Sequence, residues 1–232
     1  RQKLDLFEKF KVDFVVNQKF DKNFSQINYF EFIEKILYKK LKAKYIFVSN
    51  NFRFGNKRKG NVRSLKKLEK KFNYKIIKPT PFKSKNKIIS STLIRKLLEK
   101  GKIDLANKYL DRKWAIEGLV EKGRQMGKKI GFPTCNIRLK NYVIAKPGVY
   151  AVDVIIENNK KTLKGIANLG YRPTFNQKKI LLEVNIFNLS KNLYNKLLTV
   201  KFLKFIRGEK KFSGIKQLKK QINLDIKTAK KT

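Results

Sequence analysis

The sequence contains no histidine and a single cysteine, Cys135. One cysteine cannot form an internal disulfide bond, and the usual zinc site of cysteine and histidine ligands is excluded as well. No apolar run approaches the roughly 18 residues that a membrane-spanning helix needs, and no charged-then-apolar leader opens the chain. We therefore expect a protein of the reducing cytoplasm that has no membrane partner.

Acidic residues are also scarce. Only 17 Asp and Glu stand against 58 Lys and Arg in 232 residues, which gives a formal net charge of +41. This charge supports one hypothesis, a basic nucleic-acid-binding β-barrel, which would need aromatic side chains among basic ones on a strand face. The lysines are instead spread along the whole chain, and the aromatic residues fall mostly at apolar positions. We therefore favour the interpretation that the charge reflects drift in the overall amino-acid composition of the protein. We expect no specific nucleic-acid partner, only unspecific electrostatic attraction of nucleic acids.

The first part of the chain alternates between strand and helix patterns. Helices are predicted from a cap at Ser25 to about Leu41 and from a cap at Asn61 to Lys71. The run at 45–48 is continuously apolar, as in a parallel strand that is covered on both faces. This alternation predicts an α/β nucleotidyltransferase-like (Rossmann-like) partial domain over residues 1–110. The predicted strands are at 13–16, 45–48 and 74–77.

A pair of helices precedes a change of pattern. Ser90 caps the first helix, at 91–100, Gly101 closes it, and the second helix covers 103–110. After Trp114, short β-rich runs separated by Gly, Asn and Pro predict a six-stranded antiparallel barrel over residues 111–232, with a last helix capped by Ser213. The six runs are 115–121, 136–139, 149–156, 163–168, 181–187 and 197–205.

The most informative stretch holds three glycines in nine residues, at Gly123, Gly127 and Gly131. Glycines let the backbone approach a ligand and point N–H groups at phosphate oxygens. Lys128 adds a positive charge, and Pro133 rigidifies the exit of the loop. The spacing does not match a Walker loop, and on glycine spacing alone a plain glycine-rich hairpin is the simpler interpretation.

Two oxygen-bearing side chains follow this loop, at Thr134 and Asn136. In an extended segment, positions i and i+2 face the same way. Two neutral oxygens on one side suit a Mg²⁺ ion that also takes phosphate oxygens and water. We therefore expect Thr134 and Asn136 to share one site for Mg²⁺ and phosphate oxygens.

Read together with later segments, the stretch resembles the riboflavin kinase module of prokaryotic bifunctional riboflavin kinase/FMN adenylyltransferases, also called FAD synthetases. The resemblance implies a six-stranded Greek-key barrel that transfers the γ-phosphate of ATP to the riboflavin 5′-hydroxyl to give FMN. The matching segments, in order, are Gly131-Phe-Pro-Thr-Cys-Asn136, Pro147-Gly-Val-Tyr150, Asn168-Leu-Gly-Tyr-Arg-Pro-Thr174, Glu183-Val-Asn-Ile-Phe187, Arg207-Gly-Glu-Lys-Lys-Phe212 and Gln221-Ile-Asn-Leu-Asp225.

The resemblance also implies residue roles. Glu183 is the expected catalytic base, and it is notable as an acid inside an apolar strand. On periodicity alone, Glu183 would be an outward-facing strand acid in a salt bridge, and Arg172 could equally brace a loop. The expected flavin contacts are Arg172, Thr174 and Arg207. The expected ATP contacts are Gly123, Gly127, Lys128, Gly131, Pro133, Thr134 and Asn136.

The front part is similar to the adenylyltransferase domain of the same family at Ser49–Gly55 and Ser90–Arg95. Hydroxyls and N–H groups at a helix N-terminus suit phosphates, although an ordinary capped helix explains that segment equally well. The family's His-x-Gly-His phosphate motif is absent, so we expect the first strand and phosphate loop to be missing from this chain. The expected remnant of that site is Asn51, Arg53, Ser90, Ser91, Thr92 and Arg95.

Three departures from the family pattern lead to expectations of their own. Cys135 stands where the family has Ala, and we expect it to be packed rather than reactive. Asn185 replaces a His, which should remove only a hydrogen-bonding partner. Asn195 replaces a turn Gly, and because Asn tolerates the left-handed region, the turn should survive.

Overall fold

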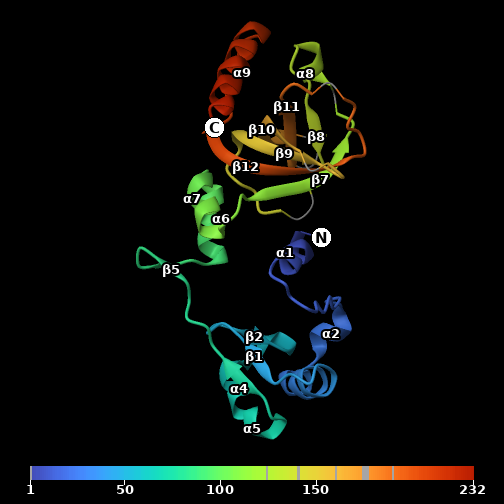
Figure 1. The fold of residues 1–232 in the computed structure, drawn as a ribbon, viewed down its shortest axis with the longest axis vertical. Coiled ribbons are helices and arrows are strands. Elements are labelled where there is room, and N and C mark those ends of the chain that lie inside the picture. Colours follow the sequence, from blue (N-terminus) through green and yellow to red (C-terminus); the bar gives the residue numbers. More distant parts are fainter. Residues whose placement is uncertain (1, 124, 140–141, 160, 174–177, 190) are drawn as a thin grey trace. The chain divides into compact units, whose positions relative to one another are not determined.

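The computed structural model describes residues 2–123, 125–139, 142–159, 161–173, 178–189 and 191–232. The side chains of residues 172, 173, 178 and 179 are not described. The chain divides into two compact units, one ending at residue 88 and the other starting at residue 89 (Figure 1).

The first unit is built around a short parallel pair, β1 (Tyr45–Phe47) and β4 (Lys75–Ile77), with Ile46 opposite Ile76. Its core consists of Ile33, Val48, Phe54, Leu65, Phe72 and Tyr74. The other elements are α1 (Gln2–Lys9), α2 (Lys22–Gln26), α3 (Tyr29–Glu31), the π-helix η1 (Phe32–Lys40), β2 (Arg53–Phe54), the 3₁₀-helix η2 (Asn56–Arg58), β3 (Gly60–Asn61), α4 (Val62–Lys67), α5 (Glu69–Phe72), β5 (Lys83–Ser84) and β6 (Lys87–Ile88).

Several local predictions for this unit are wrong. Residues 13–16 form no strand, and the Phe14 side chain is 90% exposed. The long helix is capped by Asn28, whose Oδ1 accepts the Glu31 N–H at 2.9 Å, and not by Ser25. Asn28 is the N-cap because it lies directly before the helical run that starts at Tyr29. Residues 22–26 form a separate short helix.

Two further predictions for this unit hold only in part. Asn61 caps α4 as expected, through a capping box with Ser64, but the helix breaks at Leu68 before α5. The parallel strand at 45–47 is present, yet Tyr45 and Phe47 are each 65% exposed. Within the described residues, the expectation that this strand is covered on both faces is therefore wrong.

The second unit is a closed barrel whose strands follow the order β10-β11-β8-β7-β12-β9, each antiparallel to its neighbours. Residues alternate between the interior and the outer face, so Val120, Ile137 and Leu182 are buried inside the barrel. The predicted six-stranded antiparallel barrel is confirmed. Its strands are β7 (Ala115–Glu121), β8 (Cys135–Ile137), β9 (Gly148–Ile156), β10 (Thr162–Pro173), β11 (Lys178–Ile186) and β12 (Leu197–Arg207).

The last helix, α9 (Ile215–Lys230), lies against the outer face of β9, β10 and β12 (Figure 1). Ala229 joins Val149 and Leu203 in a small buried cluster. Arg207 at the end of β12 binds Asp225 on α9, with Nη2 2.7 Å from Oδ2, and only 4% of the Asp225 side chain is exposed. The predicted Ser213 cap is wrong, because Gly214 occupies the N-cap position and no side chain caps the helix.

The helical pair α6 (Ser91–Glu99) and α7 (Ile103–Leu110) packs into the barrel unit. Leu98 and Ile103 belong to the same buried cluster as the barrel interior. The buried Asn107 joins α7 to two strand ends: its Nδ2 donates to the Phe202 carbonyl at 2.8 Å, and its Oδ1 accepts the Trp114 N–H at 2.7 Å. Packing thus assigns residues 91–110 to the barrel unit, while the domain boundary after residue 110 stays a prediction.

This geometry predicts that Asn107→Ala destabilises the barrel unit. A buried carbonyl and a buried N–H would each lose their partner, at roughly 1–3 kcal/mol per group, so we expect a loss of about 2–6 kcal/mol. Guanidinium unfolding followed by the fluorescence of Trp114, the only tryptophan, would measure it. Asn223→Ala, on the exposed face of α9, is the control and should change stability by less than about 0.7 kcal/mol. An unchanged midpoint for Asn107→Ala would contradict the role of this residue.

Candidate active site

A row of polar side chains crosses the outer face of the barrel. Glu183 on β11 stands directly opposite Asn136 on β8, and Asn136 stands directly opposite Glu121 on β7. Directly opposite residues of antiparallel strands project from the same face, with Cβ atoms about 4.5–5.5 Å apart. On the other side of β11, Asn168 on β10 is the partner of Glu183. The row therefore places one amide between two carboxylates.

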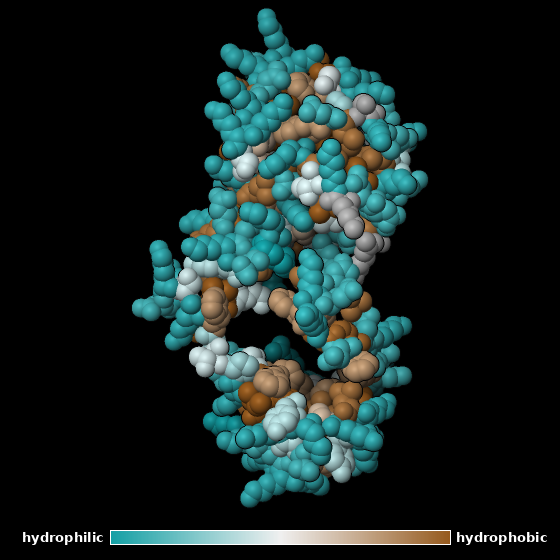
Figure 2. Space-filling view, viewed as in Figure 1, coloured by the Kyte–Doolittle hydropathy of each residue, from teal (hydrophilic) through white to brown (hydrophobic). Residues whose placement is uncertain are grey.

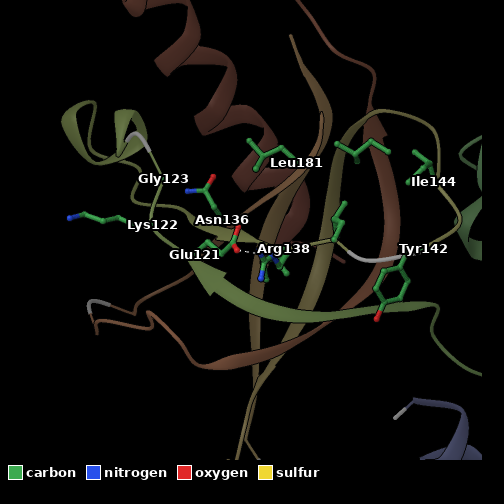
Figure 3. Close-up of a pocket in the computed structure, with 11 residues that line it drawn as sticks. Glu121, Lys122, Gly123, Asn136, Arg138, Tyr142, Ile144 and Leu181 are labelled. Atoms are coloured by element: carbon green, nitrogen blue, oxygen red, sulfur yellow. Dashed lines mark ion pairs between the residues drawn. The ribbon is translucent and has the colours of Figure 1, made fainter. Parts of the chain in front are cut away.

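Asn136 lies at the edge of a pocket of about 520 Å³ on this outer face (Figure 3). Glu121 is held there by Arg138, with Nε 2.9 Å from Oε1, while the apolar side of the pocket is formed by Leu181 and Ile144. In Figure 3 the Asn136 amide nitrogen points toward the Lys122–Gly123 backbone. The pairing of Glu121 with Arg138 offsets the charge of one of the two carboxylates that flank Asn136.

The glycine-rich segment contains a short helix, α8 (Met126–Lys129), and borders a second pocket of about 430 Å³. Thr134, Lys128 and Pro133 line it together with apolar side chains such as Leu189 and Leu193. Thr134 lines this second pocket and Asn136 lines the first, one residue before and one residue after Cys135 at the start of β8. The predicted shared site of Thr134 and Asn136 stays a prediction.

Two hydrogen bonds fix the loop to the rest of the barrel. The Asn185 amide donates to the Pro133 carbonyl at 2.6 Å, so the Asn that replaces the family's His keeps a hydrogen-bonding role. The Gln125 amide donates to the Tyr194 hydroxyl at 3.0 Å. Asn195 has a φ of 61°, which confirms the expected left-handed turn. These contacts hold the 125–134 and 192–195 segments together around the second pocket.

Cys135 packs against the barrel core, as expected. Burial raises the pKa of its thiol, which lowers the fraction of reactive thiolate at neutral pH. The thiol therefore contributes to packing against the barrel core.

The predicted flavin contacts receive uneven support. Thr174 lies outside the described residues, and only the backbone of Arg172, at the end of β10, is described. The Arg207 guanidinium is engaged by Asp225, and its Nη1 donates to the Gly208 carbonyl at 2.9 Å. This pair anchors α9 to the barrel next to the segment at 208–212.

The predicted adenylyltransferase remnant is divided between the two units. Asn51 and Arg53 lie in the first unit, where Arg53 on β2 pairs with Asn61 on β3. Ser90 caps α6 in the second unit by accepting the Leu93 N–H at 3.2 Å. Ser91, Thr92 and Arg95 are exposed on the first turns of α6. Ser90 therefore has the structural role of a helix cap, which is one of the two interpretations that the sequence allows for this segment.

Sequence reasoning assigned no site role to Glu121, Arg138 or Asn168, although Asn168 begins one of the family-like segments. Strand pairing aligns Glu121 with Asn136 and Asn168 with Glu183, and Arg138 joins them through its ion pair with Glu121. A weak signal was available: Glu121 ends an alternating run two residues before Gly123.

Family models match both parts of the chain. The riboflavin kinase (Flavokinase) model matches residues 110–232, and the FAD synthetase model matches residues 1–93. A bifunctional riboflavin kinase/FMN adenylyltransferase of Buchnera aphidicola is 42% identical over 234 residues, covering 100% of this chain and 75% of the relative. One from Haemophilus influenzae is 40% identical, covering 99% of this chain and 74% of that relative.

The chain belongs to the bifunctional riboflavin kinase/FMN adenylyltransferase family. Riboflavin, FMN and ATP are the substrates of this enzyme family. A crystal structure described as a macrolide-efflux protein from Streptococcus pneumoniae is also similar, with a TM-score of 0.85 at 27% identity, covering 99% of this chain and 73% of that one. Among the residues that the structure describes, no helix is long and apolar enough to cross a membrane.

Proposed function

We propose that the polar row on the barrel is the riboflavin kinase site and that Glu183 is its base. The observation that carries this proposal is the register: Glu183 lies directly opposite Asn136, beside the glycine-rich segment. Phosphoryl transfer needs positioning, charge neutralisation and a carboxylate near the attacking hydroxyl. Glu183 would accept the proton of the riboflavin 5′-hydroxyl as that oxygen attacks the γ-phosphorus of ATP, and ADP would leave.

The second pocket suits the adenosine part of ATP. Its apolar lining, including Leu189 and Leu193, fits a flat base, and Lys128 supplies a positive charge near the phosphates. The phosphate chain would then run along Gly127, Gly131 and Pro133, past Thr134, toward Asn136, whose amide lies against Gly123. In this arrangement the γ-phosphate reaches the polar row that contains Glu183.

Mg²⁺ fits this arrangement as an ion shared with the nucleotide. Among the described residues, no group of three or more His, Cys, Asp or Glu side chains could hold a metal. The hydroxyl of Thr134 and the amide oxygen of Asn136 are hard neutral donors, which suit a Mg²⁺ ion that keeps phosphate oxygens and waters. When bound, the ion would neutralise phosphate charge, and Thr134 and Asn136 would hold it.

We assign the flavin to the β10 side of Glu183, near the backbone of Arg172 and near Arg207. Thr174, which lies outside the described residues, stays a proposed flavin contact. Arg207 would act there mainly by fixing the 208–212 segment, since Asp225 occupies its guanidinium. Asn51, Arg53, Ser90, Ser91, Thr92 and Arg95 remain the proposed remnant of the adenylyltransferase site.

We also propose a cytoplasmic location and no specific nucleic-acid partner. The packed thiol of Cys135 is compatible with a reducing compartment. Hydrophilic side chains are spread over the visible face of both units in Figure 2 instead of gathering in one groove. This distribution favours unspecific electrostatic contact over a dedicated nucleic-acid site.

The ATP assignment predicts a specific kinetic pattern. Asn136→Ala removes an oxygen on the metal side, so we expect a higher KM for MgATP and little change in the KM for riboflavin. Thr134→Ala should behave in the same way, and Thr134→Ser should be milder because the hydroxyl remains. Initial rates measured against each substrate in turn would show this. Unchanged MgATP kinetics in both alanine variants would contradict the proposed nucleotide site.

A further inference from the structure

The three glycines of the loop face different surroundings. A Cβ atom on Gly131 would meet nothing within 4 Å, and Gly131 has a φ of +91° that favours glycine. A Cβ on Gly127 would overlap the Phe132 carbonyl oxygen. A Cβ on Gly123 would overlap the Asn136 Nδ2 and lie 2.6 Å from the Asn136 Cγ. A Cβ on Gly127 would also lie 3.3 Å from the Thr134 Oγ1, but among these three glycines only Gly123 would overlap a side chain of the proposed site.

The backbone of Gly123 does not itself require glycine, since its φ lies outside the left-handed region. An alanine would be acceptable at this position if the Asn136 amide were elsewhere. Pairing of Cys135 and Ile137 with β11 fixes the backbone on both sides of Asn136, so the overlap would be relieved by rotation of the Asn136 side chain. Its side chain also lies in a row between Glu121 and Glu183. The amide would have to rotate out of this row.

We propose that Gly123 is a positioning residue that sets the orientation of the Asn136 amide. This inference rests on the proposed nucleotide role of Asn136. In this account, glycine is needed at position 123 to make room for an amide, and not to let the backbone approach a phosphate. A displacement of the amide by about 1 Å can cost as much as 10²-fold in rate.

A double-mutant cycle separates the two roles. Gly123→Ala alone should lower kcat/KM for MgATP by about 10-fold to 10²-fold. In the Asn136→Ala background the room is restored, so adding Gly123→Ala should change kcat/KM by less than about 2-fold. Gly214→Ala is the matched control, because its Cβ would meet nothing within 4 Å and its φ of −172° is ordinary extended backbone. Melting curves would be recorded for every variant.

A direct readout does not depend on activity. The side-chain amide signals of Asn136 in a ¹⁵N spectrum, assigned by their loss in Asn136→Ala, should shift in Gly123→Ala and stay in place in Gly214→Ala. A shift combined with an unaffected Asn136→Ala enzyme would refute the nucleotide role of Asn136 while supporting the positioning contact.

Three outcomes would overturn the inference. The first is a Gly123→Ala enzyme with wild-type kinetics and unshifted Asn136 amide signals. The second is an additive loss in the double variant, which would mean that Gly123 meets the nucleotide directly. The third is a double variant that melts as early as Gly123→Ala does, which would mean that the backbone itself needs glycine. A Gly123→Ala chain that is unstable alone but stable with Asn136→Ala would support the inference.

Discussion

Glu183→Gln is expected to lower the kcat for riboflavin phosphorylation by about 10²–10⁴-fold, the usual range for the loss of a general base. The amide keeps the shape of the side chain on β11 but cannot accept the proton of the attacking hydroxyl. Riboflavin and MgATP binding should change little, so the effect should fall on kcat and not on KM. Steady-state rates at saturating concentrations of both substrates would measure it.

Glu157→Gln provides a matched control, since Glu157 is an exposed acid beyond the end of β9. This variant should keep the wild-type rate. If Glu183→Gln also kept a near-wild-type kcat, the base would be elsewhere. Glu183 would then have only the salt-bridge role on the barrel exterior that its periodicity alone suggests.

The second large effect concerns FAD. A polypeptide of these 232 residues should convert riboflavin into FMN. Its rate of FAD formation from FMN should be at least about 10²-fold lower than its rate of FMN formation. It contains no histidine, whereas the family's adenylyl-transfer motif contributes two that stabilise charge developing on the leaving pyrophosphate.

Feeding FMN and ATP directly would separate this step from the kinase step, with FAD quantified by chromatography. A mock preparation from cells that do not express this protein would show how much FAD formation comes from contaminating enzymes. Rapid FAD formation by the purified chain would refute the prediction and would mean that other residues stabilise the pyrophosphate.

The barrel was predictable because local patterns and global fold agree in it. Alternation at Val120, Ile137 and Leu182 marks strands with one buried face, and turn residues separate these strands. The run at 115–121 coincides with β7. The helical pair also followed the prediction, since a serine cap and a terminal glycine bound α6.

The first unit was harder to predict because its signals are short and compete. Asn28 and Ser25 are both good caps three residues apart, and only the start of the longer helical run separates them. Phe14 lies in an apolar run but is exposed, because hydrophobicity alone does not supply a pairing partner. In the barrel unit, the N-cap of α9 is Gly214, one residue after the predicted cap Ser213.

The candidate site was predictable as a set of residues but not as a geometry. Motif resemblance singled out Glu183 and Asn136, and the register then placed them side by side. The role of Glu121 could not be found in this way, because pairing between β7 and β8 aligns residues that are 15 positions apart. The crowding of Gly123 by Asn136 likewise appears only in three dimensions.

The most direct test of the central claim is transfer of labelled phosphate. The purified chain would be incubated with riboflavin, Mg²⁺ and ATP carrying ³²P in the γ-phosphate, beside the Glu183→Gln variant. The proposed site predicts that label appears in FMN with wild-type protein and at a rate at least about 10²-fold lower with the variant. ATP hydrolysis without labelled FMN, or equal labelling by both proteins, would contradict the assignment of the kinase site to this row.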